Sequence, residues 1–322
     1  MIITRTPLRI SFTGGGTDLA DYYKINGGAV VSMAINKYIY ITVNKKFDNA
    51  IRVSYSSTEI VQEVSELHHE LVRESMRLAD INGGIEITSI ADIPSGTGLG
   101  SSSSFTVGVL NALFTYAGHR LSGKELAELA CRVEIDILGH PIGKQDQYAA
   151  AYGGLNYFRF HSDGSVSSNR IDLKELDWRA MNRKLMLFYT GITRSADNVL
   201  TEQKKNTKNK IEVLNEMKQQ AGDLYHELAA NGFGRSFGEA LHQGWIRKQT
   251  LAGSISNPEI AHFYEQAIAA GAMGGKLLGA GGGGFLLLYC DEEKQGAVRE
   301  ALGLQQVDFG PDLYGSRVVY FA

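Results

Sequence analysis

The sequence is poor in cysteine, with only Cys131 and Cys290 among its 322 residues. Both cysteines lie in apolar runs, so we expect buried free thiols in a reducing cytoplasm rather than a disulfide. The sequence also has no low-complexity tract and no internal repeat. These absences argue against a small disulfide-stabilised domain and against a repeat architecture.

Further absences exclude classes of partner. No apolar run approaches the ~20 residues that a membrane span requires, and the first ten residues, M-I-I-T-R-T-P-L-R-I, are typical of a strand rather than a signal peptide. A net charge of −3 argues against a broad nucleic-acid surface. We therefore expect a cytoplasmic protein, monomer or homodimer, with no nucleic-acid or membrane partner. Its length allows two modest domains that share one cleft.

The most informative stretch is residues 94–105, which reads P-S-G-T-G-L-G-S-S-S-S-F. Its alternating glycines follow a strand-like run (85–90), and an apolar helical pattern (107–116) follows its serines. Glycines let the backbone approach a ligand closely, and the start of a helix attracts phosphate. The serines could cap that helix or reach a magnesium ion. A flexible Gly/Ser linker is the alternative, but the flanking strand and helix favour a phosphate-binding loop.

A second glycine-rich turn follows the first predicted strand, in which Leu8, Ile10 and Phe12 alternate with polar residues. The turn reads G-G-G-T-D and ends at Asp18. It is either a hairpin turn whose aspartate caps a helix over residues 19–23, or a turn that presents Asp18 to a ligand. The composition alone leaves both interpretations open.

Two carboxylates follow the Gly/Ser loop. A helix with a capping box begins at Ser122, and Glu134 lies at the shoulder of its apolar stripe. A carboxylate at that place needs a partner, either a metal ion or an arginine. Asp146 opens a further helix, where it acts either as an N-cap or in a site. Near the C-terminus, five glycines in positions 279–284 exceed the needs of a hairpin, which suggests backbone lying against a ligand.

These segments resemble the motifs of the GHMP small-molecule kinases, in family order and over most of the chain. The central loop resembles P-x-x-x-G-L-G-S-S, and the glycine run resembles K-x-x-G-x-G-x-G-G. The first segment resembles P-G-[KR]-x-x-x-x-G-E-H-T-D, and G-K-Q-D-Q resembles the G-[IV]-M-D-Q of galactokinases. The resemblance implies an α+β fold with an S5-like N-terminal domain (1–180), a ferredoxin-like C-terminal domain (181–322) and an active site between them.

The resemblance also implies roles for individual residues. The nucleotide phosphates are assigned to one run: Pro94, Gly96, Thr97, Gly98, Leu99, Gly100, Ser101, Ser102 and Ser103. Substrate contacts are assigned to Gly15, Gly16, Thr17, Asp18, Gly281, Gly282 and Gly283. Ser102 and Glu134 are implied as ligands of Mg²⁺. Asp146 is implied to orient or deprotonate the acceptor hydroxyl of the sugar, and Arg9 to steady both Asp146 and the γ-phosphate of ATP.

The substrate is implied by finer resemblance. Gly15 and Gly16 replace the Glu and His of galactokinases, which favours a bulkier sugar. The strings P-L-R-I-S-F-T-G-G-G-T-D, H-P-I-G-K-Q-D-Q-Y and Y-T-G-I-T-R resemble the heptose 7-phosphate kinases of this family, which phosphorylate the anomeric C1 hydroxyl. Arg194 is the candidate partner of the acceptor's own phosphate, with a surface ion pair to Asp197 or Glu202 as the alternative. Other interpretations are a kinase for a neutral sugar such as fucose or galactose, or a non-catalytic sensor, which the presence of both carboxylates opposes.

Overall fold

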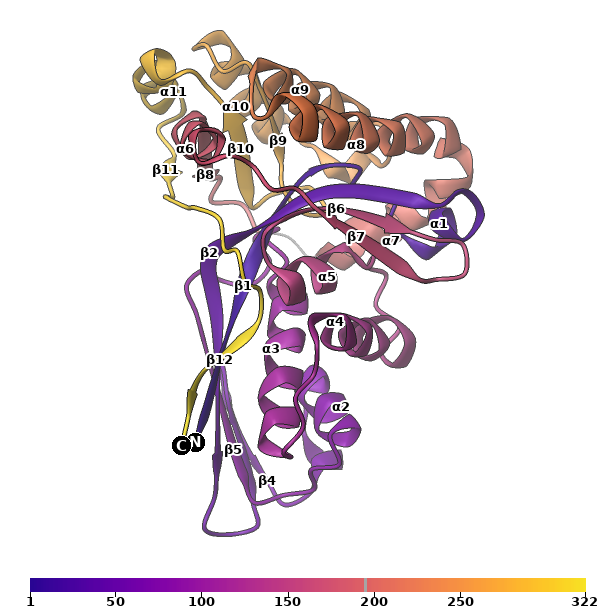
Figure 1. The fold of residues 1–322 in the computed structure, drawn as a ribbon, viewed down its shortest axis with the longest axis vertical. Helices are drawn as coiled ribbons and strands as arrows, with labels where there is room; N and C mark the ends of the chain where they lie inside the picture. The colour runs from indigo at the N-terminus through magenta and orange to yellow at the C-terminus, as the bar shows by residue number, and fades with distance from the viewer. Residues whose placement is uncertain (194–195) are drawn as a thin grey trace.

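The computed structural model describes residues 1–193 and 196–322. Within these residues it contains an eight-stranded sheet with the path β12-β1-β2-β5-β3-β4, onto which β6 and β7 are added beside β2. A separate four-stranded sheet has the order β11-β8-β10-β9. Figure 1 shows the long strands of the first sheet in the lower half of the molecule and the second sheet, with its helices, above them. The mixed α/β architecture agrees with the predicted two-domain fold.

The larger sheet is built on the antiparallel pair β1 and β2. Its strands are β1 (Ile2–Thr13), β2 (Gly28–Lys45), β3 (Ile51–Ser54), β4 (Thr58–Val61), β5 (Ile85–Ala91), β6 (Leu155–Phe160), β7 (Val166–Arg170) and β12 (Arg317–Phe321). The longest of them, β2, is continuous over 18 residues. Its pairing with β1 shifts where Pro7 opposes Tyr38 and Leu8 opposes Ile35. Proline has no N–H to donate to the ladder, so an irregularity is tolerated there.

Helices cover one face of this sheet and carry the site. They are α1 (Ala20–Asn26), α2 (Glu70–Leu78), α3 (Ser101–Tyr116), α4 (Gly123–Cys131) and α5 (Gln145–Tyr152), with a π-helical turn (Arg132–Ile137) after α4. Figure 1 shows α3 lying along the sheet, with α2, α4 and α5 on its other side. The segment before α2 begins as a strand, because Thr58–Val61, rich in β-branched residues, pairs with β3. The capping box at Ser122 and Glu125 is present, with both reciprocal hydrogen bonds.

The second half of the chain forms the smaller sheet and its helices. Its strands are β8 (Leu185–Tyr189), β9 (Gly274–Leu277), β10 (Phe285–Tyr289) and β11 (Gln305–Gln306). Its helices are α6 (Glu175–Lys184), α7 (Ala196–Asn206), α8 (Ile211–Asn231), α9 (Arg235–Gln249), α10 (Pro258–Ala269) and α11 (Gln295–Leu302). Helix α6 spans residue 180, at which the N-terminal domain was expected to end, and that division stays a prediction. The last strand, β12, pairs with β1, so both termini lie together (Figure 1).

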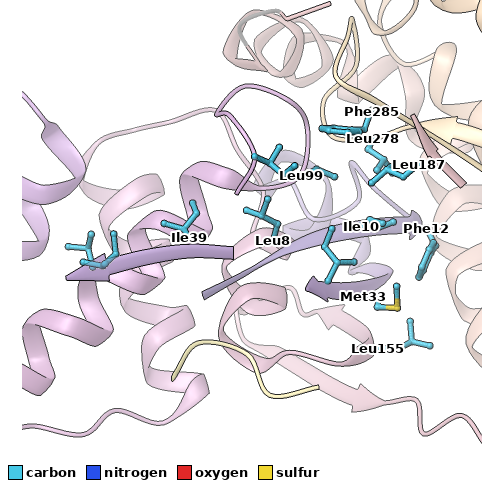
Figure 2. Packing of buried hydrophobic residues seen from close by; sticks show 14 of the residues in the cluster. Leu8, Ile10, Phe12, Met33, Ile39, Leu99, Leu155, Leu187, Leu278 and Phe285 are labelled. Carbon is cyan, nitrogen blue, oxygen red and sulfur yellow. The ribbon is translucent and has the colours of Figure 1, made fainter. Parts of the chain in front are cut away.

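A continuous apolar core joins the two sheets. Leu8, Ile10 and Phe12 of β1 are 0% exposed, as their alternation predicts. They belong to one cluster with Leu187 of β8 and Phe285 of β10, and Figure 2 shows these side chains converging where the sheets meet. This packing fixes the two halves of the chain against each other and so positions the groups between them. Both cysteines are buried free thiols, as predicted. In the described part of the chain, no helix is long and apolar enough to cross a membrane.

Candidate active site

A cavity of about 330 Å³ lies between the two halves of the chain. Its walls come from the Gly/Ser loop, the turn before α1, the start of α5, and residues of α7 and α9. From the loop it takes Gly96, Gly98, Gly100, Ser101, Ser102 and Ser103. Six of the nine residues predicted to bind the nucleotide therefore face one space, together with Arg9 and Asp146.

The three remaining loop residues support the loop from outside the cavity. Thr97 and Leu99 are fully buried, and Pro94 is exposed. The hydroxyl of Thr97 donates a hydrogen bond to the carbonyl of Pro94 (2.9 Å), and the carbonyl of Leu99 accepts one from the backbone N–H of Arg9 (3.0 Å). These bonds fix the loop to β1 without placing the three side chains at the ligand.

The loop conformation requires its glycines. Gly96, Gly98 and Gly100 have φ of 76°, 84° and 76°, a region that residues with a Cβ adopt at a cost. Helix α3 begins directly at Ser101, after an N-cap residue, Gly100, that has no side chain to cap it. The expectation that the serines cap this helix is therefore wrong, because they form its first turn. The unpaired N–H groups of that turn and the positive end of the helix are left for an anion.

Arg9 and Asp146 form a bidentate ion pair at the cavity wall. Nε of Arg9 donates to Oδ1 of Asp146 and Nη2 donates to Oδ2, both at 2.7 Å, while Nη1 donates to the carbonyl of Gly98 at 2.6 Å. The paired geometry holds the carboxylate in one orientation. Each carboxylate oxygen keeps a further acceptor site for an incoming hydroxyl. The N-cap interpretation of Asp146 is wrong, because the residue lies inside the first turn of α5, after Lys144.

Asp18 faces the same cavity from the turn after β1. The hairpin interpretation is wrong, because α1 separates β1 from β2, and its N-cap is Leu19 rather than Asp18. The Asp18 carboxylate accepts hydrogen bonds from the backbone N–H of Gly16 (3.0 Å) and of Gln145 (3.2 Å). Burial, and then the charge of Asp146, raise the pKa of the Asp18 carboxyl above its ordinary value. The turn therefore presents Asp18 beside Asp146.

The other residues of this turn either line the cavity or hold the turn in shape. Gly15 and Gly16 line the cavity. Thr17 is fully buried, and its hydroxyl donates to the carbonyls of Gly14 (2.8 Å) and Ala29 (2.9 Å). Thr17 thus closes the turn, and its position away from the cavity indicates support rather than contact.

Glu134 is fully buried on the π-helical turn, next to the loop. Its Oε1 accepts a hydrogen bond from the hydroxyl of Ser102 (2.9 Å) and its Oε2 accepts one from Nε2 of Gln147 (2.7 Å). Burial raises the pKa of this carboxyl. The arginine alternative is wrong for the described residues, among which no cation pairs with Glu134. A buried carboxylate with only neutral partners beside a hydroxyl offers the hard oxygen donors that Mg²⁺ prefers.

This pair is not a complete metal cage by itself. In the part of the chain that the structure describes, no group of three or more His, Cys, Asp or Glu side chains gathers at a possible metal site. Mg²⁺ in nucleotide sites is commonly bound by one or two protein groups together with substrate phosphates. The residues present at Ser102 and Glu134 fit that arrangement.

The glycine run after β9 is packed by backbone. An added Cβ would lie 2.7 Å from the backbone of Ile255 at Gly281 and 2.5 Å from the carbonyl of Ile192 at Gly283. Gly282 donates its N–H to the carbonyl of Ile255 (2.8 Å). Of this run, Gly279 and Ala280 line the cavity. Substrate contact by residues 281–283 stays a prediction, and Arg194 lies outside the described residues.

Several cavity residues escaped the sequence analysis. Ser11, Gln145 and Gln203 line the cavity, and so does Lys248 of α9. A signal for Lys248 was available, because it shares the apolar face of α9 with Leu241 and Trp245 at i, i+4 and i+7. A lysine at such a position is seldom buried without a reason. Ser11, Gln145 and Gln203 carried no comparable pattern.

His140 also lines the cavity, where its Nε2 lies 2.9 Å from Oε1 of Glu70. The two residues come from the loop before α5 and from the start of α2. Their contact joins α2 to the rim of the site.

Comparison with known proteins matches both halves of the chain to one family. Residues 59–154 match the GHMP kinases N terminal domain and residues 224–307 match the GHMP kinases C terminal domain. The chain is 31% identical to D-glycero-alpha-D-manno-heptose 7-phosphate kinase from Campylobacter jejuni, over 95% of this chain and 94% of that protein. It is 29% identical to L-fucokinase/L-fucose-1-P guanylyltransferase from Bacteroides fragilis, over 92% of this chain and 35% of that longer protein.

Solved structures of other kinases also match the fold of this chain. A D-glycero-D-manno-heptose 1-phosphate kinase from Bacteroides thetaiotaomicron superimposes with a TM-score of 0.83 at 26% identity, over 100% of both chains. Mevalonate kinase, at 19% identity and a TM-score of 0.73, shares the fold. The chain therefore belongs to the GHMP kinase family and is a phosphotransferase with an alcohol as acceptor.

Proposed function

We propose that this protein transfers the γ-phosphoryl group of ATP to the anomeric C1 hydroxyl of D-glycero-D-manno-heptose 7-phosphate. The product would be the 1,7-bisphosphate, a precursor of nucleotide-activated heptose for surface polysaccharide. The observation that carries the proposal is the convergence of the Arg9–Asp146 pair, Asp18 and the Gly/Ser loop on one cavity. The choice of sugar is supported by the 31% identity to a heptose 7-phosphate kinase.

On the donor side, the backbone of the loop and the first turn of α3 would hold the phosphates of ATP. Gly96, Gly98 and Gly100 line the cavity, and the positive end of α3 favours anions. Ser102 and Glu134 would hold Mg²⁺ through their oxygen atoms. When bound, the ion would neutralise part of the charge on the phosphates.

On the acceptor side, the cavity is prepared for a ligand with many hydroxyl groups. Among the described residues, three buried side-chain atoms without a hydrogen-bond partner belong to cavity-lining residues near Asp18: Oγ of Ser11, Oε1 of Gln145 and Nε2 of Gln203. Unsatisfied buried polar atoms are costly, so a polar ligand is expected to complete them. Gly15 adds room, because an added Cβ would meet no atom closer than 3.6 Å.

The chemistry follows from the position of Asp146. The acceptor hydroxyl would donate a hydrogen bond to the free lone pairs of its carboxylate, which Arg9 keeps in place. The bond between the γ-phosphorus and the ADP oxygen breaks, the bond to the sugar oxygen forms, and the hydroxyl proton passes to Asp146. The remaining contribution of the site is alignment of the two reactants.

An ADP-release assay across heptose 7-phosphate, fucose, galactose and mannose tests the proposal. We expect kcat/KM for heptose 7-phosphate to exceed that for each neutral sugar by at least about 10²-fold, because the 7-phosphate would make charge-assisted hydrogen bonds that a neutral sugar cannot make. A preference for fucose or galactose would overturn the substrate while leaving the kinase chemistry intact. Absence of ADP release with all four sugars would overturn both, and would favour a sensor.

A further inference from the structure

Lys248 is a buried cation at the wall of the active-site cavity. Its side chain extends from the last turn of α9, and the residue is 5% exposed. Within the described part of the chain, its ammonium donates one hydrogen bond, to the carbonyl of Gly279. Since an ammonium carries three N–H donors, two remain for a ligand. A buried charge that no carboxylate among the described residues pairs with is unfavourable, which indicates that a substrate supplies the partner.

The second observation concerns the charges available to a phosphoryl group. Among the described residues that line the cavity, the only lysine and arginine side chains are Lys248 and Arg9. Three of the five N–H donors of Arg9 are used, because Nε and Nη2 donate to Asp146 and Nη1 donates to the carbonyl of Gly98. Its charge is offset by that of Asp146. Lys248 is therefore the cation at this cavity whose charge no ion pair offsets among the described residues.

The third observation is where the ammonium lies. Gly279, its hydrogen-bond partner, is in backbone contact with Gly98 of the Gly/Ser loop. The electrostatic field at Lys248 includes contributions from Arg9, Asp18 and Asp146. Lys248 thus lines the same cavity as the loop assigned to the donor phosphates and the carboxylates assigned to the acceptor.

We propose that Lys248 is a catalytic residue whose ammonium contacts the non-bridging oxygens of the phosphoryl group during its transfer. The reaction balances without a change at Lys248. The phosphorus–oxygen bond to ADP breaks, the bond to the acceptor oxygen forms, and the acceptor proton passes to Asp146. Lys248 stays protonated and lowers the energy of the charge that is spread over the moving group. The inference rests on the kinase chemistry and not on the identity of the sugar.

The ionisation of Lys248 predicts a specific pH dependence of kcat/KM. Burial, and then the nearby charge of Arg9, lower the pKa of its ammonium to about 8, while Asp18 and Asp146 oppose that shift. Lys276 of β9 is a further titratable group nearby, and burial, then the charge of Lys248, lower its pKa. Below pH 8 the ammonium is charged, and above it the charge is lost. We therefore expect kcat/KM, which reports the free enzyme, to fall as the pH rises through about 8.

Two substitutions and one control test the proposal, with the sugar that proves active in the ADP-release assay. Lys248→Met removes the charge and keeps most of the length, and Lys248→Arg keeps a permanent charge. Lys218→Met is the control, because Lys218 of α8 also donates to a backbone carbonyl across the two halves of the chain, that of Asn26 (2.8 Å), outside the cavity. We expect Lys248→Met to lower kcat by roughly 10²-fold or more, with the KM values for ATP and sugar changed by less than about threefold.

We expect Lys248→Arg to retain more turnover than Lys248→Met and to lose the basic limb of the pH profile, because arginine stays protonated. Titration calorimetry with ADP, sugar and aluminium fluoride, a mimic of the moving group, adds a readout other than turnover. Binding of the mimic should weaken in Lys248→Met and persist in Lys218→Met. If Lys248→Met does not fold, the pH profile of Lys248→Arg tests the inference alone. Loss of the basic limb supports it, and an unchanged basic limb contradicts it.

Three results would overturn the inference. Wild-type kcat in Lys248→Met is the first. A rise confined to the KM for a phosphorylated sugar, without a loss in kcat, would instead place Lys248 at the acceptor's own phosphate. A lowered melting temperature with an unchanged basic limb in Lys248→Arg would make the residue structural. If heptose 7-phosphate is not a substrate but another sugar is, the substrate proposal fails and the test of Lys248 stands.

Discussion

Asp146 and Asp18 at the cavity wall and Glu134 beside the Gly/Ser loop are held in three different ways, and their environments separate their roles. Among the described residues, Asp146 is paired with Arg9, Asp18 accepts from backbone N–H groups, and Glu134 accepts from two neutral side chains. Burial raises the pKa of both Asp18 and Glu134. The residues are thus suited to an oriented base, a hydrogen-bonding contact and a metal ligand, in that order.

Replacing Asp146 with asparagine tests the first role. Asparagine keeps the size of the side chain but removes the charge that pairs with Arg9 and that we propose receives the hydroxyl proton. We expect Asp146→Asn to lower kcat by roughly 10²-fold or more, with the KM for ATP largely kept. Steady-state kinetics at saturating Mg²⁺ measure this, with the exposed Asp163→Asn as control. Near-normal turnover in Asp146→Asn would contradict the assignment.

Replacing Glu134 with glutamine separates function from stability. The folded pKa of Glu134 is raised above its unfolded value, so the fold disfavours the ionised carboxylate at any pH above the folded pKa. A neutral glutamine removes that penalty and can still pair with Ser102 and Gln147. In the metal-free protein we therefore expect Glu134→Gln to have an unfolding temperature at neutral pH equal to or above that of the wild type.

The same substitution should raise the Mg²⁺ concentration needed for half-maximal activity by roughly tenfold or more, because an oxygen ligand with negative charge is lost. Thermal unfolding and Mg²⁺ titrations of activity measure the two effects. A loss of stability together with an unchanged Mg²⁺ requirement would show that Glu134 serves folding instead.

At the scale of elements, the loop before α3 both lines the cavity and contacts the segment that follows β9. Its glycines differ in which of the two they face. An added Cβ at Gly98 would lie 2.5 Å from the carbonyl of Leu278, whereas at Gly96 it would meet nothing within 4 Å. The sequence suggested that a side chain at Gly98 would fill space meant for phosphate. The structure shows that it would first collide with the segment that follows β9. Gly98 therefore joins the two halves of the chain as well as lining the cavity.

Alanine at these two positions should separate the effects. Gly98→Ala should lower the unfolding temperature by several degrees and weaken ATP binding, since both the φ strain and the clash apply. Gly96→Ala adds only the φ strain and a methyl group near the nucleotide, so its stability should change less. Calorimetric titration with ATP and thermal unfolding of both variants measure this. Equal stability losses would contradict the distinction.

The π-helical turn after α4 explains why Glu134 was only partly placed by its sequence. On a regular helix of 100° per residue it lies at the shoulder of the apolar stripe. The wider turn at Arg132–Ile137 changes the angular position of the residues after Cys131. Glu134 becomes fully buried and faces Ser102. Such a turn has no signature in the hydrophobic pattern.

At the scale of the whole molecule, Lys276 links the two sheets. Its ammonium donates to the carbonyl of Phe12 on β1 (3.0 Å), while its backbone belongs to β9. Burial, and then the charges of Lys248 and Arg9, lower its pKa well below the ordinary lysine value. Because the unfolded chain binds this proton more tightly, wild-type stability should rise with pH from the lowered folded pKa up to about 10.4.

Lys276→Met removes the titrating group. We expect the free energy of unfolding of the wild type, relative to Lys276→Met, to increase between about pH 6 and about pH 9, a range below the unfolded lysine pKa. Urea unfolding at several pH values measures the difference. A difference that is independent of pH, or that falls as the pH rises, would show that Lys276 does not titrate as its burial indicates.

Patterns of neighbouring residues in the sequence determined much of the secondary structure of this protein. The alternation of Leu8, Ile10 and Phe12, the capping box at Ser122 and the glycines of the loop each act through neighbours in the sequence, so they were predictable. Resemblance to the GHMP motifs added Arg9, Asp146 and Glu134, which the composition alone left open. The strand at Thr58–Val61 and the helix α6 were missed, because pairing and packing outweighed local preference there.

Only the tertiary structure decided which residues meet. Arg9 and Asp146 are 137 residues apart, and their pairing depends on β1 and α5 reaching the same edge of the cavity. Lys248 becomes a cavity residue because α9 packs beside β9 and brings its last turn to Gly279. Burial and the distances between charges are properties of the folded chain. They set the ionisation of Asp18, Glu134 and Lys248, so these pKa shifts cannot be predicted from residues that are neighbours in the sequence.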